Sequence, residues 1–138
     1  MTDRSFPTVV QTVLDTTDPR GLAEFYRALL GLSYRPGDEP PADGEPDPNG
    51  ADWLVLTGAF PLAFQYVPEL AATTWPDPEV PQQLHIDITV TSTDELDRHS
   101  RRAVELGARL LRDRSDDPEE PLRVFADPAG HPFCLFVG

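Results

Sequence analysis

"TVVQTVLDTTDPRGLAEFYRALLGL", residues 8–32, contains a predicted strand followed directly by a predicted helix. Residues 8–16 are rich in β-branched side chains and partly alternate between apolar and polar, which is typical of a strand. Asp18 can cap the helix, and Pro19 occupies the first helical position, where a missing N–H costs nothing. Five apolar residues then fall at helical spacing before Gly31, a typical helix stop: Leu22, Phe25, Tyr26, Leu29 and Leu30.

The same order of elements returns 74 residues later, because residues 83–92 read as a strand and residues 93–109 as a helix. Thr93 or Asp94 can cap this second helix, and Gly107 lies at its end. At this offset Gln11 falls on His85. Two strands forming a hairpin, 52–58 and 61–67, follow the first helix, and a strand pair in 122–138 follows the second. The sequence therefore predicts an internal repeat of strand, helix and hairpin.

Each helix of this repeat can cover only one face of its strands, so we expect the halves to bury a shared core and leave a concave face. The 138 residues predict a single domain, with module 1 at about 8–68, a proline-rich linker at about 69–82 and module 2 at about 83–138. Residues 35–50 are rich in Pro, Gly and acid, and residues 112–121 are highly charged, so both are predicted loops. Whether 35–50 and 69–82 close over the concave face stays open.

Composition excludes several classes of function. A net charge of −13 opposes binding to nucleic acid, and the chain has no lysine for a Schiff base or a P-loop. A single cysteine excludes an intramolecular disulfide and a zinc site made of cysteines alone. No apolar run reaches the roughly 18 residues of a membrane span, and no signal-peptide pattern is present. We therefore expect a cytoplasmic protein that binds no membrane.

Several segments in order carry a family resemblance: "DPRGLAEFYRALLGL", "LAFQYVPE", "WPDPEVPQQLHIDITV" and "DPAGHPFCLF". The chain resembles the vicinal oxygen chelate superfamily of glyoxalase I, bleomycin-resistance proteins and extradiol dioxygenases, in its glyoxalase-like branch. The resemblance implies an α+β fold with two βαβββ modules, which form a cup-shaped, largely antiparallel sheet with helices on the outer face. It also implies a homodimer.

Enzymes of this superfamily hold a divalent metal at four inward-facing positions, commonly His, Glu, His and Glu. By resemblance these positions fall on Gln11, Gln65, His85 and Cys134. This is a poor donor set, because amide oxygens are weak ligands and a thiol binds metal only as thiolate. We expect a degenerate site without a cofactor. The alternative is a metal ion, Zn, Ni, Mn or Fe, held by Gln11, Gln65, His85 and Cys134. Asp87, which shares a strand face with His85, would supplement these ligands.

The same residues also allow structural roles. Cys134 is more often a buried small hydrophobe than a nucleophile, and His85 can be a hydrogen-bonded pocket residue. Gln11 and Gln65 are expected to line a wet cavity, since buried amides need partners. His131 is expected in an exposed turn or as a cap.

The tryptophans and His99 likewise have an expected position. His99 is expected on the helix surface. Trp53 and Trp75 are candidate ligand contacts, with Trp75 in the linker as a pocket wall.

Two hypotheses follow for function. The first is a module that binds a small, partly apolar organic molecule in the cup. The second is a glyoxalase-type lyase or isomerase, metal-dependent or metal-free, with His85 as ligand or general base and Asp87 orienting it. A dioxygenase is less favoured, because only one histidine lies at a relevant position. The sequence leaves open whether the protein is an enzyme.

Overall fold

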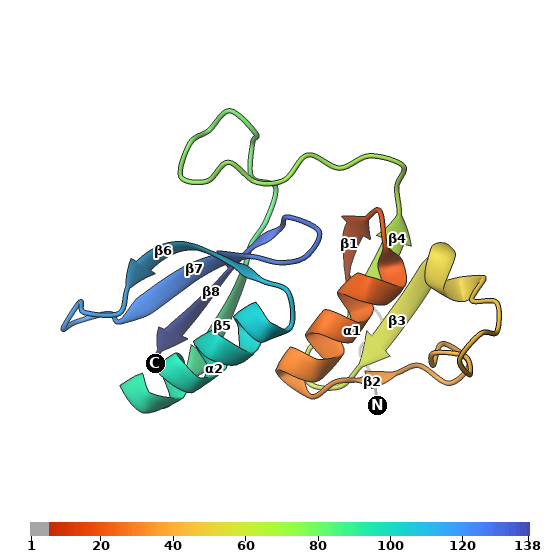
Figure 1. Ribbon diagram of the computed structural model, residues 1–138, viewed down its shortest axis with the longest axis horizontal. Coiled ribbons are helices and arrows are strands. Elements are labelled where there is room, and N and C mark those ends of the chain that lie inside the picture. Colours follow the sequence, from red (N-terminus) through yellow and green to blue (C-terminus); the bar gives the residue numbers. More distant parts are fainter. Residues whose placement is uncertain (1–5) are drawn as a thin grey trace.

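The computed structural model describes residues 6–138 and shows an α+β protein made of two similar modules (Figure 1). Module 1 contains β1 (Thr12–Thr16), α1 (Pro19–Leu30), β2 (Ser33–Tyr34), a short 3-10 helix (Asn49–Ala51), β3 (Trp53–Thr57) and β4 (Leu62–Tyr66). Module 2 contains β5 (Ile86–Val90), α2 (Thr93–Glu105), β6 (Arg109–Arg114), β7 (Leu122–Ala126) and β8 (Pro132–Val137). The predicted βαβββ repeat is thus confirmed.

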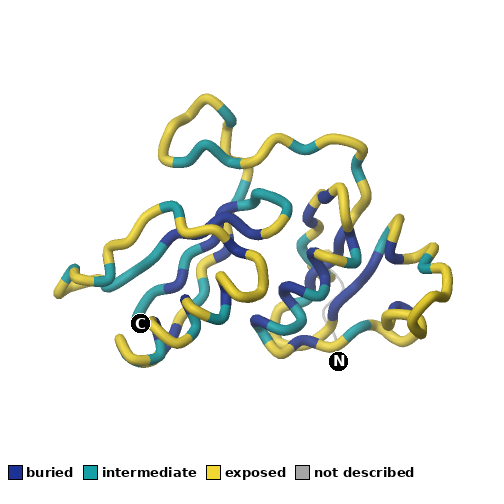
Figure 2. Tube along the Cα trace, viewed as in Figure 1, coloured by how far each residue is buried: buried dark blue, intermediate teal, exposed yellow. Residues whose placement is uncertain are grey.

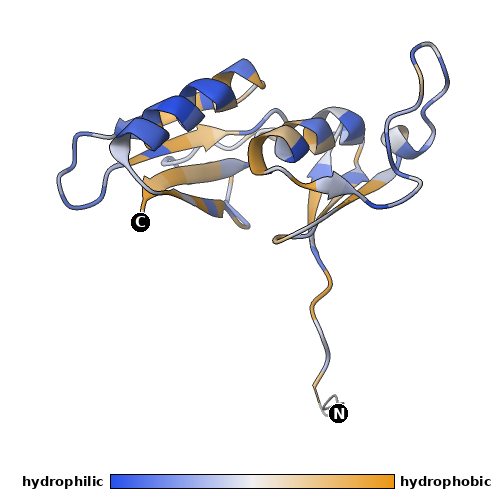
Figure 3. Cartoon of the chain, turned by 90° about the horizontal axis from the view of Figure 1, so that it is seen from below, coloured by the Kyte–Doolittle hydropathy of each residue, from blue (hydrophilic) through white to orange (hydrophobic). Residues whose placement is uncertain are grey.

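Each module forms its own four-stranded sheet. Sheet A has the order β1-β4-β3-β2 and sheet B the order β5-β8-β7-β6, and within residues 6–138 no strand ladder joins the two sheets. In each sheet the first strand pairs in parallel with the last, and the other pairings are antiparallel. Both helices lie on the same side of the sheets (Figure 3). The opposite side of each sheet is called its helix-free face below.

The helix boundaries follow local capping. Asp18 Oδ1 accepts a hydrogen bond from Gly21 N at 3.0 Å, and Gly31 ends α1 with a φ of 67°, as predicted. The prediction for α2 was wrong by one residue, because Ser92 is the cap: its Oγ accepts from Glu95 N at 3.1 Å. Helix α2 ends at Glu105, before Gly107.

Three strand predictions differ from the structure. The first strand begins at Thr12, so residues 8–11 lie outside it. The two-residue β2 follows α1 without a sequence signal. Strand β6 covers residues that the sequence assigned to the end of a helix and a charged loop. Its sequence RLLRDR is mostly exposed, because β6 is an edge strand that needs no apolar alternation to pair with β7.

One hydrophobic core joins the two modules (Figure 2). The α1 stripe contributes Leu22, Phe25, Tyr26 and Leu29, and α2 contributes Leu96 and Ala103. The rings of Tyr26 and Phe133, which come from different modules, lie 6.3 Å apart. The Tyr26 hydroxyl also donates to Asp127 Oδ2 of module 2 at 2.6 Å. The modules are therefore joined by apolar packing and by a buried hydrogen bond.

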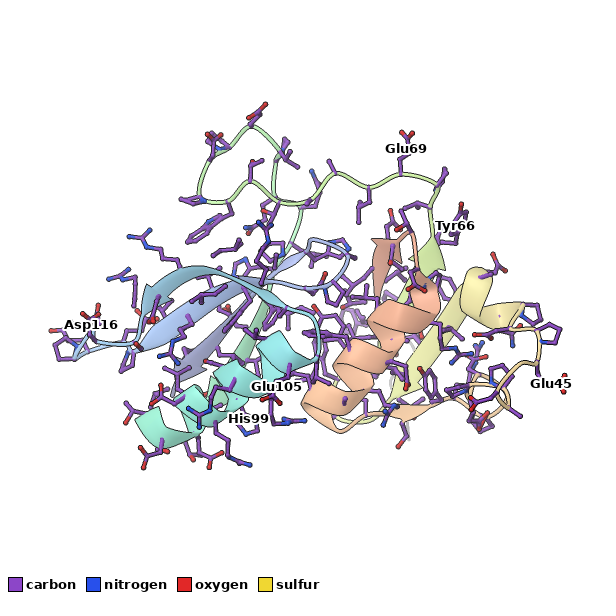
Figure 4. The ribbon with its side chains drawn as sticks, in the orientation of Figure 1. Glu45, Tyr66, Glu69, His99, Glu105 and Asp116 are labelled. Atoms are coloured by element: carbon purple, nitrogen blue, oxygen red, sulfur yellow. The ribbon has the colours of Figure 1, made fainter. Side chains whose placement is uncertain are left out.

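Loop 35–50 is fixed beside α1. Arg20 donates to Asp47 Oδ2 at 2.8 Å and to the carbonyl of Asp38 at 2.7 Å. Glu45 marks the outer end of this loop, far from Glu69 on the linker (Figure 4). In residues 6–138 no helix is long and apolar enough to cross a membrane.

Candidate ligand-binding site

The strand registers place most of the predicted site residues on the helix-free faces. In sheet A, Asp15 pairs with Gln65, and both alternate with the core residues Leu14 and Phe64. In sheet B, Asp87 pairs with Cys134, and Cys134 alternates with the core residues Phe133 and Leu135. Side chains on one strand face point the same way, so His85 shares the face of Asp87.

A cavity of about 450 Å³ lies between the modules, and it is called the inter-module cavity below. Strands β1 and β4 form one wall, the linker forms another, and the turn before β8 forms the third. Its polar lining is Asp15, Gln65, Thr73, Gln82, Gln83 and His131, and its apolar lining includes Val13, Leu14, Leu70, Ala71, Val80, Pro81, Leu84 and Pro132. The lining therefore mixes apolar contact area with a few polar groups, as small-molecule sites do.

The linker forms a fixed wall over this cavity. Thr73 N donates to the carbonyl of Gly130 at 2.9 Å. A side chain at Gly130 would begin 2.7 Å from Ala72 Cα, so only glycine allows this close approach. Further along, Thr74 Oγ1 accepts from Val80 N at 2.9 Å, which closes the linker into a loop. Figure 1 shows this segment arching from β4 to β5.

A second, smaller recess of about 90 Å³ lies on the helix-free side of sheet B and is called the Trp75 recess. It is lined by Trp75, Gln82, His85, Val124, Pro132 and Cys134. Two of these residues, Gln82 and Pro132, also line the inter-module cavity, so the two spaces adjoin. The predicted wall role of Trp75 is consistent with this placement.

The predicted site residues are therefore divided. His85, Cys134 and Trp75 meet in the Trp75 recess, whereas Gln65 lies in the inter-module cavity. Gln11 is half-buried just before β1, and Trp53 is half-buried opposite Gln65 on β3; neither lines these two spaces.

His85 is held on both sides of its ring. Its Nδ1 lies 2.8 Å from Gln82 Oε1, and its Nε2 lies 3.2 Å from Asp87 Oδ1. In the metal-free enzyme hypothesis Asp87 orients the His85 ring, and the contact between Asp87 and His85 meets this requirement. Because both ring nitrogens already have partners, His85 also fits the alternative of a hydrogen-bonded pocket residue.

The surroundings of Cys134 disfavour its thiolate form. Burial, reinforced by the negative charge of its hydrogen-bond partner Asp87, raises the pKa of Cys134 to about 11. Only a thiolate attacks electrophiles or binds metal, so at neutral pH this residue does neither well. The packing role is therefore the better interpretation of Cys134.

The donor set does not fit a divalent metal. Val13 corresponds to Asp87 at the 74-residue offset. In sheet A, Val13 pairs with Ala63, and in sheet B, Asp87 pairs with Cys134, so Ala63 is the counterpart of Cys134 by strand pairing. Ala63, which offers no donor atom, thus occupies the place of Cys134, and Gln65 lies two residues beyond it. No group of three or more His, Cys, Asp or Glu residues within 6–138 is arranged to hold a metal.

Sequence reasoning expected His131 in an exposed turn or as a cap, and it missed that this residue also lines the inter-module cavity. Its Nε2 donates to the carbonyl of Asp15 at 2.6 Å, across 116 residues of sequence. No local pattern in either segment could have revealed this contact, because it depends on how the two modules pack. His99 lies on α2 with its Nε2 3.2 Å from Glu95 Oε2 (Figure 4), but its side chain is half-buried and not on the open helix surface that the sequence predicts.

Comparison with known proteins gives a family match and a set of similar folds. A family profile described as a glyoxalase-like domain matches residues 11–136. No curated protein matches the chain. A glyoxalase/bleomycin resistance protein/dioxygenase family enzyme from Burkholderia phytofirmans PsJN shares the fold with a TM-score of 0.66 and 14% identity, over 92% of this chain and 95% of that chain.

Two solved complexes share the fold as well. The fosfomycin resistance protein of Listeria monocytogenes, complexed with Mn(II) and a dihydroxypropylphosphonic acid, has a TM-score of 0.66 and 17% identity, covering 96% of this chain and 93% of that chain. The bleomycin-binding protein of Streptomyces verticillus, complexed with copper(II)-bleomycin, has a TM-score of 0.54 and 19% identity, covering 96% and 99%. At these identities the likeness concerns the fold alone.

Proposed function

The chain belongs to the glyoxalase-like domain family, within the vicinal oxygen chelate superfamily, and we propose that it binds a small, partly apolar organic molecule in the inter-module cavity. One observation carries this proposal: about 450 Å³ of space lies between the modules, with apolar walls, several polar groups and a linker fixed over it. Ligand pockets typically occupy about 300–1,000 Å³ and have such a lining.

The chemistry of the site residues favours binding over catalysis. A nucleophile must ionise near working pH, and the raised pKa of Cys134 opposes this. Of the donors at the four superfamily positions, Gln65 lines the inter-module cavity, His85 and Cys134 line the Trp75 recess, and Gln11 lines neither. The bleomycin-binding protein of Streptomyces verticillus provides a precedent for a binder with this fold.

The test is a titration of a panel of small aromatic and aliphatic compounds, followed by the fluorescence of Trp75 and Trp53. A blocking variant, Val13→Phe, places a larger side chain in the cavity wall and should abolish saturable binding. The matched control is Val104→Phe, at an exposed valine of α2 that does not line the inter-module cavity, which should leave binding there unchanged. Saturable binding that survives Val13→Phe would locate the site elsewhere, and the absence of any saturating ligand would count against a binding function.

A second candidate function rests on the contact between His85 and Asp87. With Asp87 Oδ1 at 3.2 Å from its Nε2, His85 could serve as the general base of a metal-free lyase or isomerase acting at the Trp75 recess. His85→Ala should then abolish turnover while leaving the thermal transition near that of the wild type. If the wild-type protein turns over neither aldehyde–thiol adducts nor catechols, this candidate is rejected.

We also propose that the protein is a homodimer. Phe6, Val9 and Val10 are 74%, 88% and 72% exposed, on a segment that projects from the helix-free side (Figure 3). Exposed apolar side chains in a row are typical of a protein contact. A second copy that covers this segment would remove it from water.

A further inference from the structure

The positive charges of this chain are distributed very unevenly. No arginine or lysine occurs between residues 36 and 97, although this stretch carries 13 of the 24 acidic residues. It contains β3, β4, the linker and β5, and so supplies most of the inter-module cavity. The remaining lining comes from residues 13–15 and 130–132, which also contain no arginine or lysine. The cavity is thus built from segments that lack a permanent positive charge.

The polar groups in the cavity favour positive charge in a ligand. Asp15 is exposed there and supplies a carboxylate next to the Gln65 amide. The one basic ring in the lining, His131, already donates Nε2–H to the Asp15 carbonyl. A cation in this space would meet a carboxylate, whereas an anion would lose water without gaining a cationic partner.

The acidic residues of the linker add to the negative potential around the cavity, but none of them lines it. The linker carries three acidic residues, Glu69, Asp77 and Glu79, and no basic residue. Glu69 projects outward from the linker in Figure 4. Clefts bordered by charges of one sign raise the local concentration of ligands of the opposite sign.

Arginines on other elements of the two modules have ion-pair partners outside the cavity or lie on a distant strand. Arg20 pairs with Asp47 beside α1, and Arg123 pairs with Asp97 on the helix side of sheet B. By register, Arg112 and Arg114 share the helix-free face of sheet B with Cys134, but they lie on β6. Three strand spacings, about 14 Å, separate β6 from β5, so neither backbone borders the cavity.

We infer that the ligand of the inter-module cavity combines an apolar body with a positively charged group, which Asp15 binds, and that phosphonates and carboxylates are excluded. This inference rests on the proposed binding function and narrows it to organic cations such as amidines and amines. Its physical basis is the single carboxylate in an arginine-free lining, within a chain of net charge −13.

The test compares three probes with the same ring and different charge: benzamidine, benzamide and benzoate. Ligand-observed NMR titrations of the full chain at low ionic strength should rank their affinities benzamidine, then benzamide, then benzoate. Asp15→Asn should weaken the binding of benzamidine about fivefold, which is what a solvent-accessible charge pair contributes. The affinity for benzamide should stay unchanged. Added salt should weaken only benzamidine. The matched control is Asp43→Asn, in the exposed loop beside α1, which should change none of the three.

The outcomes separate the inference from the function on which it rests. If benzamide or benzoate binds as tightly as benzamidine, or if Asp15→Asn has no effect, the charge preference is wrong and the binding function stands. If none of the three probes binds at millimolar concentration, or if their binding is unaffected by Val13→Phe, the proposed binding function of the cavity fails together with the charge preference. Binding that shows the expected order and is lost in Val13→Phe supports both.

Discussion

Replacing Tyr26 by phenylalanine tests how the two modules are joined. The Tyr26 ring is fully buried, and its hydroxyl donates to Asp127 Oδ2 at 2.6 Å. Asp127 is also buried, and its other oxygen accepts from the backbone N–H groups of Ala129 and His131. Phenylalanine keeps the packing and removes only the hydroxyl, so one carboxylate oxygen loses its partner. Leaving such an oxygen unsatisfied costs about 1–3 kcal/mol.

The assay is urea unfolding, followed by the fluorescence of the two tryptophans, one in each half of the chain. For a protein whose free energy of unfolding is about 5–15 kcal/mol, this loss of free energy clearly lowers the urea concentration at the unfolding midpoint. The dependence of the free energy of unfolding on urea concentration should stay unchanged. The matched control is Tyr66→Phe at an exposed tyrosine, which should stay within about 0.5 kcal/mol of the wild type. A Tyr26→Phe protein as stable as this control would refute the argument that the hydrogen bond stabilises the module contact.

The penalty should also depend on pH. Burial raises the pKa of Asp127, whereas the Tyr26 hydroxyl lowers it by stabilising the carboxylate. Removing the hydroxyl therefore raises the pKa of Asp127 further in the folded state. A carboxyl group whose pKa is higher in the folded than in the unfolded protein stabilises the fold at pH values below its pKa in the unfolded protein. This stabilisation is lost as the pH rises through its pKa in the folded protein. The destabilisation by Tyr26→Phe should accordingly be larger at neutral pH than at a pH below the ordinary pKa of aspartate.

Three further changes have defined outcomes. Gly130→Ala should destabilise the fold by about 1–3 kcal/mol in thermal unfolding, because the residue has a φ of 97° and its new methyl group would meet Ala72; no destabilisation would contradict the close contact. Cys134 should react with iodoacetamide far more slowly than an unfolded control, with a rate that rises until the pH reaches about 11; fast labelling at neutral pH would show an ionised thiol. The double variant Val9→Ser, Val10→Ser should convert a dimer to a monomer in light scattering, and a monomeric wild type would remove the basis of the homodimer proposal.

The candidate site shows where sequence reasoning ends. The alternation around His85 predicted correctly that Asp87 shares its strand face, because a strand with one buried face has a period of two. The division of Gln65 from His85 and Cys134 could not be predicted, because it depends on the register of strands far apart in the chain. The contact of His131 with Asp15 likewise joins residues 116 positions apart.

The sequence by itself determined the elements whose signals are local. Helix α1 follows from Asp18, Pro19, Gly31 and its apolar stripe, and the repeat follows from the return of the same order 74 residues later. Only the tertiary structure decided that the charged segment Arg109–Arg114 is a strand, since its pairing partner β7 comes later in the chain. The tertiary structure also decided how the modules pack, and with it the cavity between them. Capping and periodicity act within a few residues, whereas a cavity exists only where segments distant in sequence come together in space.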